Sequence, residues 1–134
     1  MSSAIDTAGR WLEVLATGAV AEWDGLVDPD FSMHVPFMPG ESPEPTVGLE
    51  PNRARVAALW AAWEQFEFTD TEIHAAADDP ELIFVTSRSV AKTVWGAPYE
   101  NRYMIRLRVH DGIVREHLEF MNPAPVLAAF EGHL

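Results

Sequence analysis

Two ionisable side chains stand two residues apart near the end of the chain, in the stretch EHLEFMNP, residues 116–123. If this stretch is a strand, His117 and Glu119 lie on the same face, because side chains alternate between the two faces of a strand. A carboxylate beside an imidazole can exchange protons near neutral pH. We therefore take Glu119 and His117 as candidate catalytic residues. The alternative is a solvated strand face, with the more apolar face of Val114 and Leu118 packed on the protein.

The preceding stretch carries further polar residues at strand spacing. Asn101 and Tyr103 share a face with Ile105, opposite a row of arginines that is typical of an exposed outer face. An amide and a phenol pointing inward could orient a polar substrate, so both are candidate substrate-binding residues. Alternatively, Tyr103 is a core aromatic residue with its hydroxyl at the rim.

Four further residues complete the candidate set. Asp70 is a third candidate catalytic group, with simple solvation as the alternative. His34 and His74 alternate with polar residues in predicted strands and are candidates for substrate binding, although a lone strand histidine is commonly structural. Trp60 is the last candidate for substrate binding, although its helical spacing from Trp63 is more typical of a core position.

Several kinds of site have no motif in this sequence. It contains no glycine-rich phosphate loop, no His-Glu-x-x-His and no Gly-x-Ser-x-Gly. With no cysteine there is no thiolate nucleophile, disulfide or cysteine metal site. We expect no metal and no cofactor, which leaves general acid/base chemistry or the binding of an apolar ligand.

The composition and net charge limit the kinds of molecule that the protein is expected to bind. The 134 residues are 48% hydrophobic and 22% charged, which predicts one globular domain over residues 1–134. A net charge of −12, with only nine lysines and arginines, argues against nucleic acid. The N-terminus lacks a signal-peptide pattern, and no apolar run approaches the roughly 18 residues of a membrane span. We therefore expect a cytoplasmic protein that acts on a small molecule and binds no membrane.

The elements that must position these residues follow from periodicity. Apolar spacing predicts a helix capped by Ser2 or Ser3 and ended by Gly18, then a short helix over residues 19–27 and a strand near 31–37. The Pro-rich segment 36–51 reads as a long loop and a candidate lid, and a third helix follows from Pro51. The expected apolar faces are Ile5, Ala8, Leu12 and Leu15 for the first helix and Val56, Leu59, Trp60 and Trp63 for the third.

The second half is rich in residues that favour strands. Four antiparallel strands are predicted over residues 66–77, 81–95, 99–110 and 113–121, with a hairpin at Asp111-Gly112 and a closing helix after Pro123. This order predicts an α+β fold, a cone-shaped barrel in which a curved, mostly antiparallel sheet wraps around the N-terminal helices. The open mouth of such a cone is a common place for a small-molecule site.

The segment YENRYMIRLRVHDGIVREHLEFMNP, residues 99–123, resembles the phenazine-biosynthesis A/B family, a SnoaL-like branch of the nuclear transport factor 2 superfamily. The resemblance implies the same cone-shaped fold, usually as a homodimer packed through the sheet. It also implies that Glu119 is an acid/base in cofactor-free chemistry and that Tyr103 matches a family tyrosine. A family histidine falls near Asp70 here, and the longer N-terminal region of phenazine enzymes is missing, so we expect a different substrate.

Three functions remain open at this point. The first is a cofactor-independent cyclase, isomerase or condensing enzyme of a secondary-metabolite pathway, in which Glu119 moves protons with help from His117 or Asp70. The second is water addition to an epoxide, using Asp70, Glu119 and Asn101. The third is a non-catalytic carrier that holds an apolar molecule in the same cone.

Overall fold

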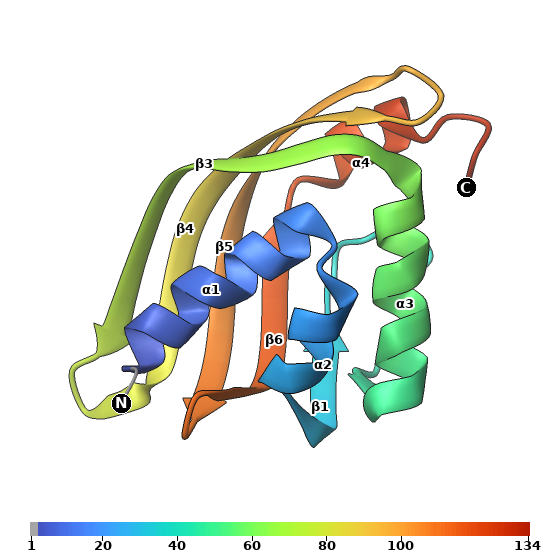
Figure 1. Cartoon of the computed structure of the whole chain (residues 1–134). Coiled ribbons are helices and arrows are strands. Elements are labelled where there is room, and N and C mark those ends of the chain that lie inside the picture. The colour runs from blue at the N-terminus through green and yellow to red at the C-terminus, as the bar shows by residue number, and fades with distance from the viewer. Residues whose placement is uncertain (1–2) are drawn as a thin grey trace.

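The computed structural model describes residues 3–134 as four helices and six strands (Figure 1). In chain order they are α1 (Ala4–Thr17), α2 (Val20–Leu26), β1 (Val27–His34), β2 (Thr46–Val47), α3 (Leu49–Ala62), β3 (Trp63–Ala76), β4 (Asp79–Thr93), β5 (Pro98–His110), β6 (Ile113–Met121) and α4 (Pro123–Ala129).

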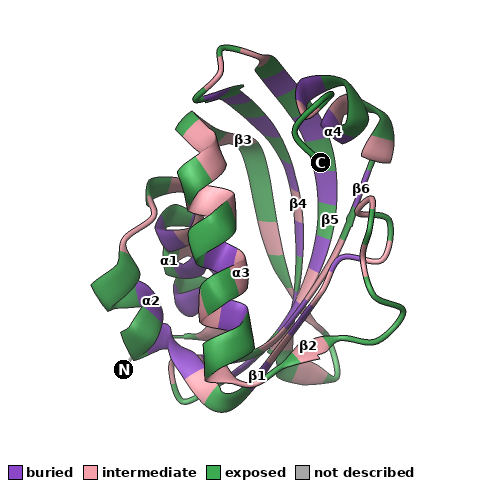
Figure 2. Cartoon of the chain, turned by 90° about the vertical axis from the view of Figure 1, so that its right-hand side faces the viewer, coloured by how far each residue is buried: buried purple, intermediate pink, exposed green. Residues whose placement is uncertain are grey.

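One curved sheet forms the frame, with strand order β2-β1-β6-β5-β4-β3. The strands from β3 to β6 pair antiparallel with their neighbours in sequence, and β1 runs parallel to β6. Helices α1, α2 and α3 lie on the concave side, and α4 lies at one end (Figures 1 and 2). The α+β fold expected from the sequence is confirmed, although the sheet is open rather than a closed barrel.

Helix α1 begins and ends at the expected signals. Ser3 caps it, accepting a hydrogen bond from the amide of Asp6, and Gly18 ends it in the left-handed conformation. Ser2, the other predicted cap, lies outside the described residues. The buried face differs from the prediction: Ile5 is exposed, and Trp11 is fully buried in the middle of that face. Trp11 fits the same helical spacing and supplies far more apolar area.

The segment predicted as one long loop contains regular structure. Thr46 and Val47 form β2 against the edge strand β1, and α3 already begins at Leu49. The side-chain amide of Asn52 organises this turn by donating to the carbonyls of Phe31, Thr46 and Gly48. An edge strand of two residues forms only a short ladder of backbone hydrogen bonds with β1. The bonds from Asn52 add to that ladder.

Helix α3 ends at Ala62, whereas the apolar face predicted for this helix extends to Trp63. Trp63 is the first residue of β3, not part of the α3 face, while Val56 is buried as expected. The first strand also starts earlier than expected, at Val27. Tertiary pairing decides both boundaries, because Trp63 pairs with Thr93 of β4 and Val27 with Val114 of β6.

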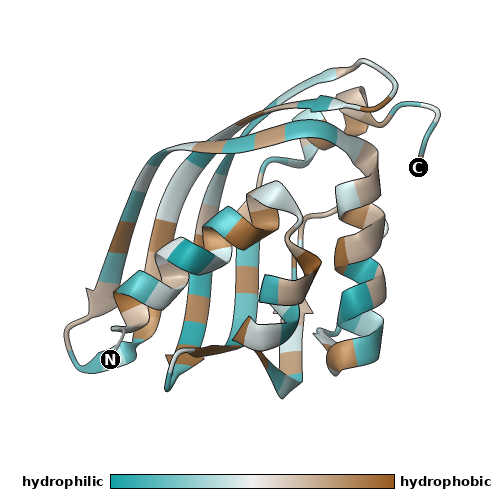
Figure 3. Ribbon diagram, in the orientation of Figure 1, coloured by the Kyte–Doolittle hydropathy of each residue, from teal (hydrophilic) through white to brown (hydrophobic). Residues whose placement is uncertain are grey.

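Burial alternates along β5 and along β4 from Ile83 onward. On β5 from Ile105 to Val109 the hydropathy alternates as well, which gives the brown and teal bands of Figure 3. On β5 the residues from Tyr99 to Val109 at every second position are buried, and Arg102 and Arg108 are exposed on the outer face as predicted. The hairpin at Asp111-Gly112 is confirmed, with positive φ at both residues.

Strand β6 decides between the two alternatives for its faces. The face that carries His117, Glu119 and Met121 packs toward the helices, whereas Leu118 is only partly buried and Phe120 is exposed. A register shift beside β5, between Arg108 and Val109, lets Val114 point inward as well. The polar face is buried because its polar groups have hydrogen-bond partners, which removes most of the desolvation cost.

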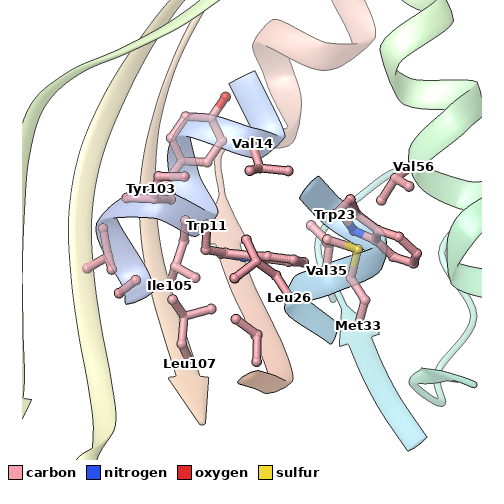
Figure 4. Packing of buried hydrophobic residues seen from close by; sticks show 14 of the residues in the cluster. Trp11, Val14, Trp23, Leu26, Met33, Val35, Val56, Tyr103, Ile105 and Leu107 are labelled. Atoms are coloured by element: carbon pink, nitrogen blue, oxygen red, sulfur yellow. The ribbon is translucent and has the colours of Figure 1, made fainter. Parts of the chain in front are cut away.

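The core lies between the sheet and the helices (Figure 4). Tyr103, Ile105 and Leu107 of β5 line up beneath α1 in Figure 4. Phe31 packs edge-on against Trp11 and Trp23, with ring centroids 5.4 and 6.2 Å apart. This packing fixes α1 and β1 against the inner face of β6.

Two glycines give a matched test of the helix ends. Gly18 has φ +72°, and a Cβ there would meet the ring of Trp60 at 3.3 Å, whereas a Cβ at Gly25 of α2 would meet nothing within 4 Å. Gly18→Ala should lower the free energy of unfolding by about 1–2 kcal/mol, because a left-handed alanine is strained. Gly25→Ala should leave stability unchanged or raise it by up to about 1 kcal/mol. Urea unfolding measures both, and equal losses would contradict this assignment.

Candidate active site

A cavity opens between the inner face of the sheet and the helices. Its volume is about 140 Å³. Most of its lining is aromatic or aliphatic, and the polar groups come from β5 and β6. The lining residues are Leu15, Met33, Met38, Leu59, Trp63, Phe66, Phe68, Tyr99, Tyr103, Glu119, Met121, Val126, Phe130 and Leu134.

Glu119 supplies the carboxylate of this cavity, and its side chain is 15% exposed. Strand alternation places it inward, opposite Ile105 of β5. Its Oε1 lies 2.9 Å from Nε2 of His117, whose side chain is fully buried and does not line the cavity. On the other side of that ring, the indole Nε1 of Trp11 donates to Nδ1 of His117 at 3.0 Å. The carboxylate therefore lies between the cavity and a buried histidine.

A string of hydroxyl groups forms a second polar feature. Ser89 Oγ lies 2.7 Å from Tyr103 Oη, and Tyr103 Oη donates to Tyr99 Oη at 3.1 Å. The amide of Asn101 donates to the same Tyr99 oxygen at 2.6 Å. With two donors on its oxygen, Tyr99 keeps its own O–H for another acceptor. Both tyrosines line the cavity.

Burial controls the protonation of these phenols. Desolvation raises the pKa of Tyr99 and that of Tyr103 above the ordinary value near 10, and the negative charge of Glu119 raises both further. Both hydroxyls are therefore protonated at physiological pH. They are hydrogen-bond donors that face a cavity containing a carboxylate.

The structure separates Asp70 from the site. Asp70 has φ +51° at a register shift in β3, its side chain is 76% exposed, and its nearest cation is Arg88 at 3.8 Å. It does not line the cavity with Glu119. Asn101 is buried and binds Tyr99, the backbone of Asn122 and its own strand, so it orients a tyrosine rather than facing the cavity itself.

The remaining candidates also lie outside the cavity lining. His34 Nε2 lies 3.2 Å from the carbonyl of Ser42, and His74 is exposed on β3. Trp60 donates its indole N–H to the carbonyl of Leu15 at 2.9 Å, which ties α3 to the last turn of α1. Water addition to an epoxide was expected to use Asp70, Glu119 and Asn101. Of these three, the cavity lining contains Glu119 and neither of the others, so the structure does not bring them together.

Sequence reasoning missed three residues of the site. Tyr99 shares the alternation of Asn101 and Tyr103, and extending that pattern by two residues would have found it. Trp63 lines the cavity from the start of β3, and its buried indole N–H has no hydrogen-bond partner within residues 3–134. Trp11 reaches His117 over 106 residues of sequence, and no local pattern signals such a contact.

Segment 36–51 contributes Met38 to the cavity lining. Glu41 holds the segment in place by accepting from the amide of Val35 at 2.7 Å and from Arg55 of α3 at 2.8 Å. The Glu41 side chain is 10% exposed, so this ion pair is largely shielded from solvent. The segment is therefore tied to α3.

Two properties of the described chain bear on function classes. Within residues 3–134 no group of three or more histidine, aspartate or glutamate side chains is arranged to hold a metal ion. No helix in that range has the length and apolar character needed to cross a membrane.

Three bacterial proteins are among the solved structures with a similar fold. A protein of Bacillus subtilis provisionally named an isomerase superposes with a TM-score of 0.84 at 19% identity, covering 99% of both chains. A protein of Pseudomonas putida KT2440, provisionally named a polyketide cyclase, superposes with a TM-score of 0.82 at 12% identity. The superposition covers 96% of this chain and 98% of that one. A phenazine biosynthesis-related protein of Pseudomonas aeruginosa superposes with a TM-score of 0.72 at 18% identity. The superposition covers 85% of this chain and 72% of that one.

These identities are low, and the likeness establishes the shared fold. No curated protein matches the sequence. The sequence pattern of the SnoaL-like domain, in contrast, matches residues 8–117, which span α1 to the middle of β6 and include Trp11, Tyr99, Tyr103 and His117. The chain therefore belongs to the SnoaL-like domain family.

Proposed function

We propose that this protein is a cofactor-independent enzyme that moves a proton on a small carbonyl compound, with Glu119 as the acid/base. One observation carries the proposal: Glu119 is the only carboxylate among the described residues that line the apolar cavity, and within residues 3–134 its Oε2 has no hydrogen-bond partner. A carboxylate in an apolar cavity can exchange a proton with a substrate there.

The hydroxyl string supports a carbonyl substrate. In the proposed step Oε2 of Glu119 takes a proton from the carbon next to a carbonyl group. The C–H electron pair forms a C=C bond to the carbonyl carbon, the π pair of the carbonyl moves to its oxygen, and the O–H of Tyr99 donates a hydrogen bond to the enolate oxygen. If the enolate is conjugated with a C=C bond, return of the proton from Glu119 to the far carbon of that bond gives an isomer. If the enolate carbon attacks a second carbonyl of the same molecule, a C–C bond closes a ring, the π pair of that carbonyl moves to its oxygen, and the oxygen takes the proton from Glu119.

The size of the cavity limits the substrate. A volume of about 140 Å³ is close to the roughly 150 Å³ cavity that accommodates benzene in an engineered protein. We infer a single-ring substrate for the conformation described here, held by the aromatic wall of Trp63, Phe66 and Phe68. The resemblance of residues 99–123 to phenazine-biosynthesis proteins supports a substrate from secondary metabolism.

A panel of single-ring ketones, amino ketones and epoxides tests the proposal. Binding is followed by NMR shifts of the ligand and turnover by product analysis. We expect turnover of a carbonyl compound and none of an epoxide, because Asp70 and Glu119 are not brought together. Binding without turnover of any member would favour the carrier function.

We further propose that the protein is a homodimer, formed through the outer face of the sheet. Met104 of β5 pairs with Phe120 of β6 on that face, and both side chains are exposed, as is Phe84 of β4. Between them, the buried Nε of Arg106 has no hydrogen-bond partner within residues 3–134. A second copy packed on this face would cover the apolar groups and could supply an acceptor for Arg106.

Sedimentation velocity of two matched variants tests this interface. Met104→Lys places a charge in the centre of the outer face and should convert a dimer into a monomer. Leu127→Lys on α4 changes an equally exposed apolar residue away from that face and should leave the dimer intact. A monomeric native protein would rule out the interface.

A further inference from the structure

The hydrogen bond between Trp11 and His117 determines where the imidazole carries its proton. An indole N–H can only donate. Because Trp11 Nε1 lies 3.0 Å from Nδ1 of His117, that nitrogen must accept and therefore carries no hydrogen. Trp11 is fully buried and so is the His117 side chain, so water cannot replace either partner.

The same constraint defines the contact with Glu119. In a neutral imidazole without a hydrogen on Nδ1, the proton is on Nε2. His117 Nε2 then donates to Oε1 of Glu119 over 2.9 Å. A doubly protonated ring would point a second N–H at the N–H of Trp11 in a buried place, which leaves both donors unpaired and is costly.

We propose that Trp11 is a positioning residue that holds His117 as the neutral Nε2–H tautomer, so that Glu119 alone exchanges protons with the substrate. His117 then serves as a fixed donor that orients the carboxylate and leaves Oε2 available. The assignment of the tautomer stands on geometry alone, and its consequence for catalysis rests on the proposed function.

Few titratable groups lie close enough to His117 to change the charge on its imidazole. On β6 the ionisable neighbour is Glu119, and the residues paired with His117 are Leu107 of β5 and Met33 of β1. Helix α1 contributes Trp11. Among residues 3–134, the titratable groups that line the cavity with the carboxylate are Tyr99 and Tyr103, which are neutral because their pKa values are raised.

Solution NMR of the native protein tests the tautomer directly. We expect the ring-nitrogen shifts of His117 at neutral pH to show a hydrogen on Nε2 and none on Nδ1, because the Trp11 N–H already occupies Nδ1. A through-bond coupling between Trp11 Nε1 and His117 Nδ1 should also be seen. A hydrogen on Nδ1, alone or together with one on Nε2, would overturn the proposal whatever the enzyme's reaction is.

Two variants test the consequence for catalysis. Trp11→Phe keeps a buried ring but removes the donor, so His117 becomes free to take a second proton. The pH profile of turnover should then differ from that of the native enzyme, because an imidazolium beside Glu119 weakens the base. An unchanged pH profile in a folded Trp11→Phe variant would contradict the positioning role.

His117→Gln separates the positioning role from an acid/base role. A glutamine amide can accept from Trp11 and donate to Glu119 but cannot transfer a proton. We expect it to retain turnover within about tenfold of native, far above the hundredfold loss that removal of an acid/base causes. A loss equal to that of Glu119→Gln would make His117 the acid/base and overturn the proposal. If native NMR shows the tautomer but Glu119→Gln keeps full turnover, the proposed function fails and the tautomer assignment stands.

Discussion

Glu119→Gln should lower kcat by about a hundredfold or more and leave binding of the ring ketone nearly unchanged. A positioned acid/base contributes roughly 10²–10⁴-fold to rate. The amide preserves the shape of the carboxylate and still accepts from His117 through its oxygen, so the cavity keeps its shape. Steady-state kinetics and ligand-observed NMR measure the two effects separately.

Glu116→Gln is the matched control for that variant. Glu116 lies on the same strand but on the outer face, where it pairs with Arg108 at 2.8 Å. Removal of this partly exposed charge should change kcat by less than twofold and stability by at most about 1 kcal/mol. Native turnover in Glu119→Gln, or an equal loss in both variants, would show that Glu119 is not the proton-transfer group.

Tyr99→Phe should cost about 10²–10³-fold in kcat, the effect of removing one donor to a developing oxyanion. Tyr99 is the end of the hydroxyl string, and its own proton is the one left for a substrate oxygen. Because its pKa is raised, the loss should be the same at pH 6 and pH 9. A pH–rate profile of native protein and variant checks both the size and the constancy of the effect.

Tyr103→Phe tests which hydroxyl contacts the substrate, that of Tyr99 at the end of the string or that of Tyr103 in its middle. That variant removes the donor to Tyr99 and leaves Ser89 without its phenol partner, yet the O–H of Tyr99 remains. We expect a smaller loss than for Tyr99→Phe, because Asn101 still orients the Tyr99 oxygen. A larger loss in Tyr103→Phe would assign the substrate contact to Tyr103.

The part of the site that follows from strand alternation could be predicted. Glu119 and Tyr103 face inward because β5 and β6 keep a period of two, and the Asp111-Gly112 turn sets the register between them. The α+β fold followed from the order of helical and strand patterns. Tyr99 obeys the same alternation, so its omission came from ending the pattern two residues too soon.

The rest of the site depends on contacts that have no local signature. Trp11 and His117 meet only because α1 packs across β6, and a helix pattern alone cannot say which strand it covers. Asp70 matched a strand pattern, but a register shift in β3 and positive φ turn it to solvent. The burial of His117 contradicts the usual preference of polar faces for water, because two specific partners compensate for the loss of hydration.

Deuterium exchange at the carbon next to the carbonyl of cyclohexanone, followed by proton NMR in D₂O, tests proton transfer in the cavity most directly. It needs no knowledge of the natural product, because exchange is the first half of every reaction proposed. We expect native protein to accelerate exchange of the bound ketone well above the buffer rate and Glu119→Gln not to do so. Exchange at the buffer rate for a ketone that demonstrably binds in the cavity would show that Glu119 is not an acid/base there.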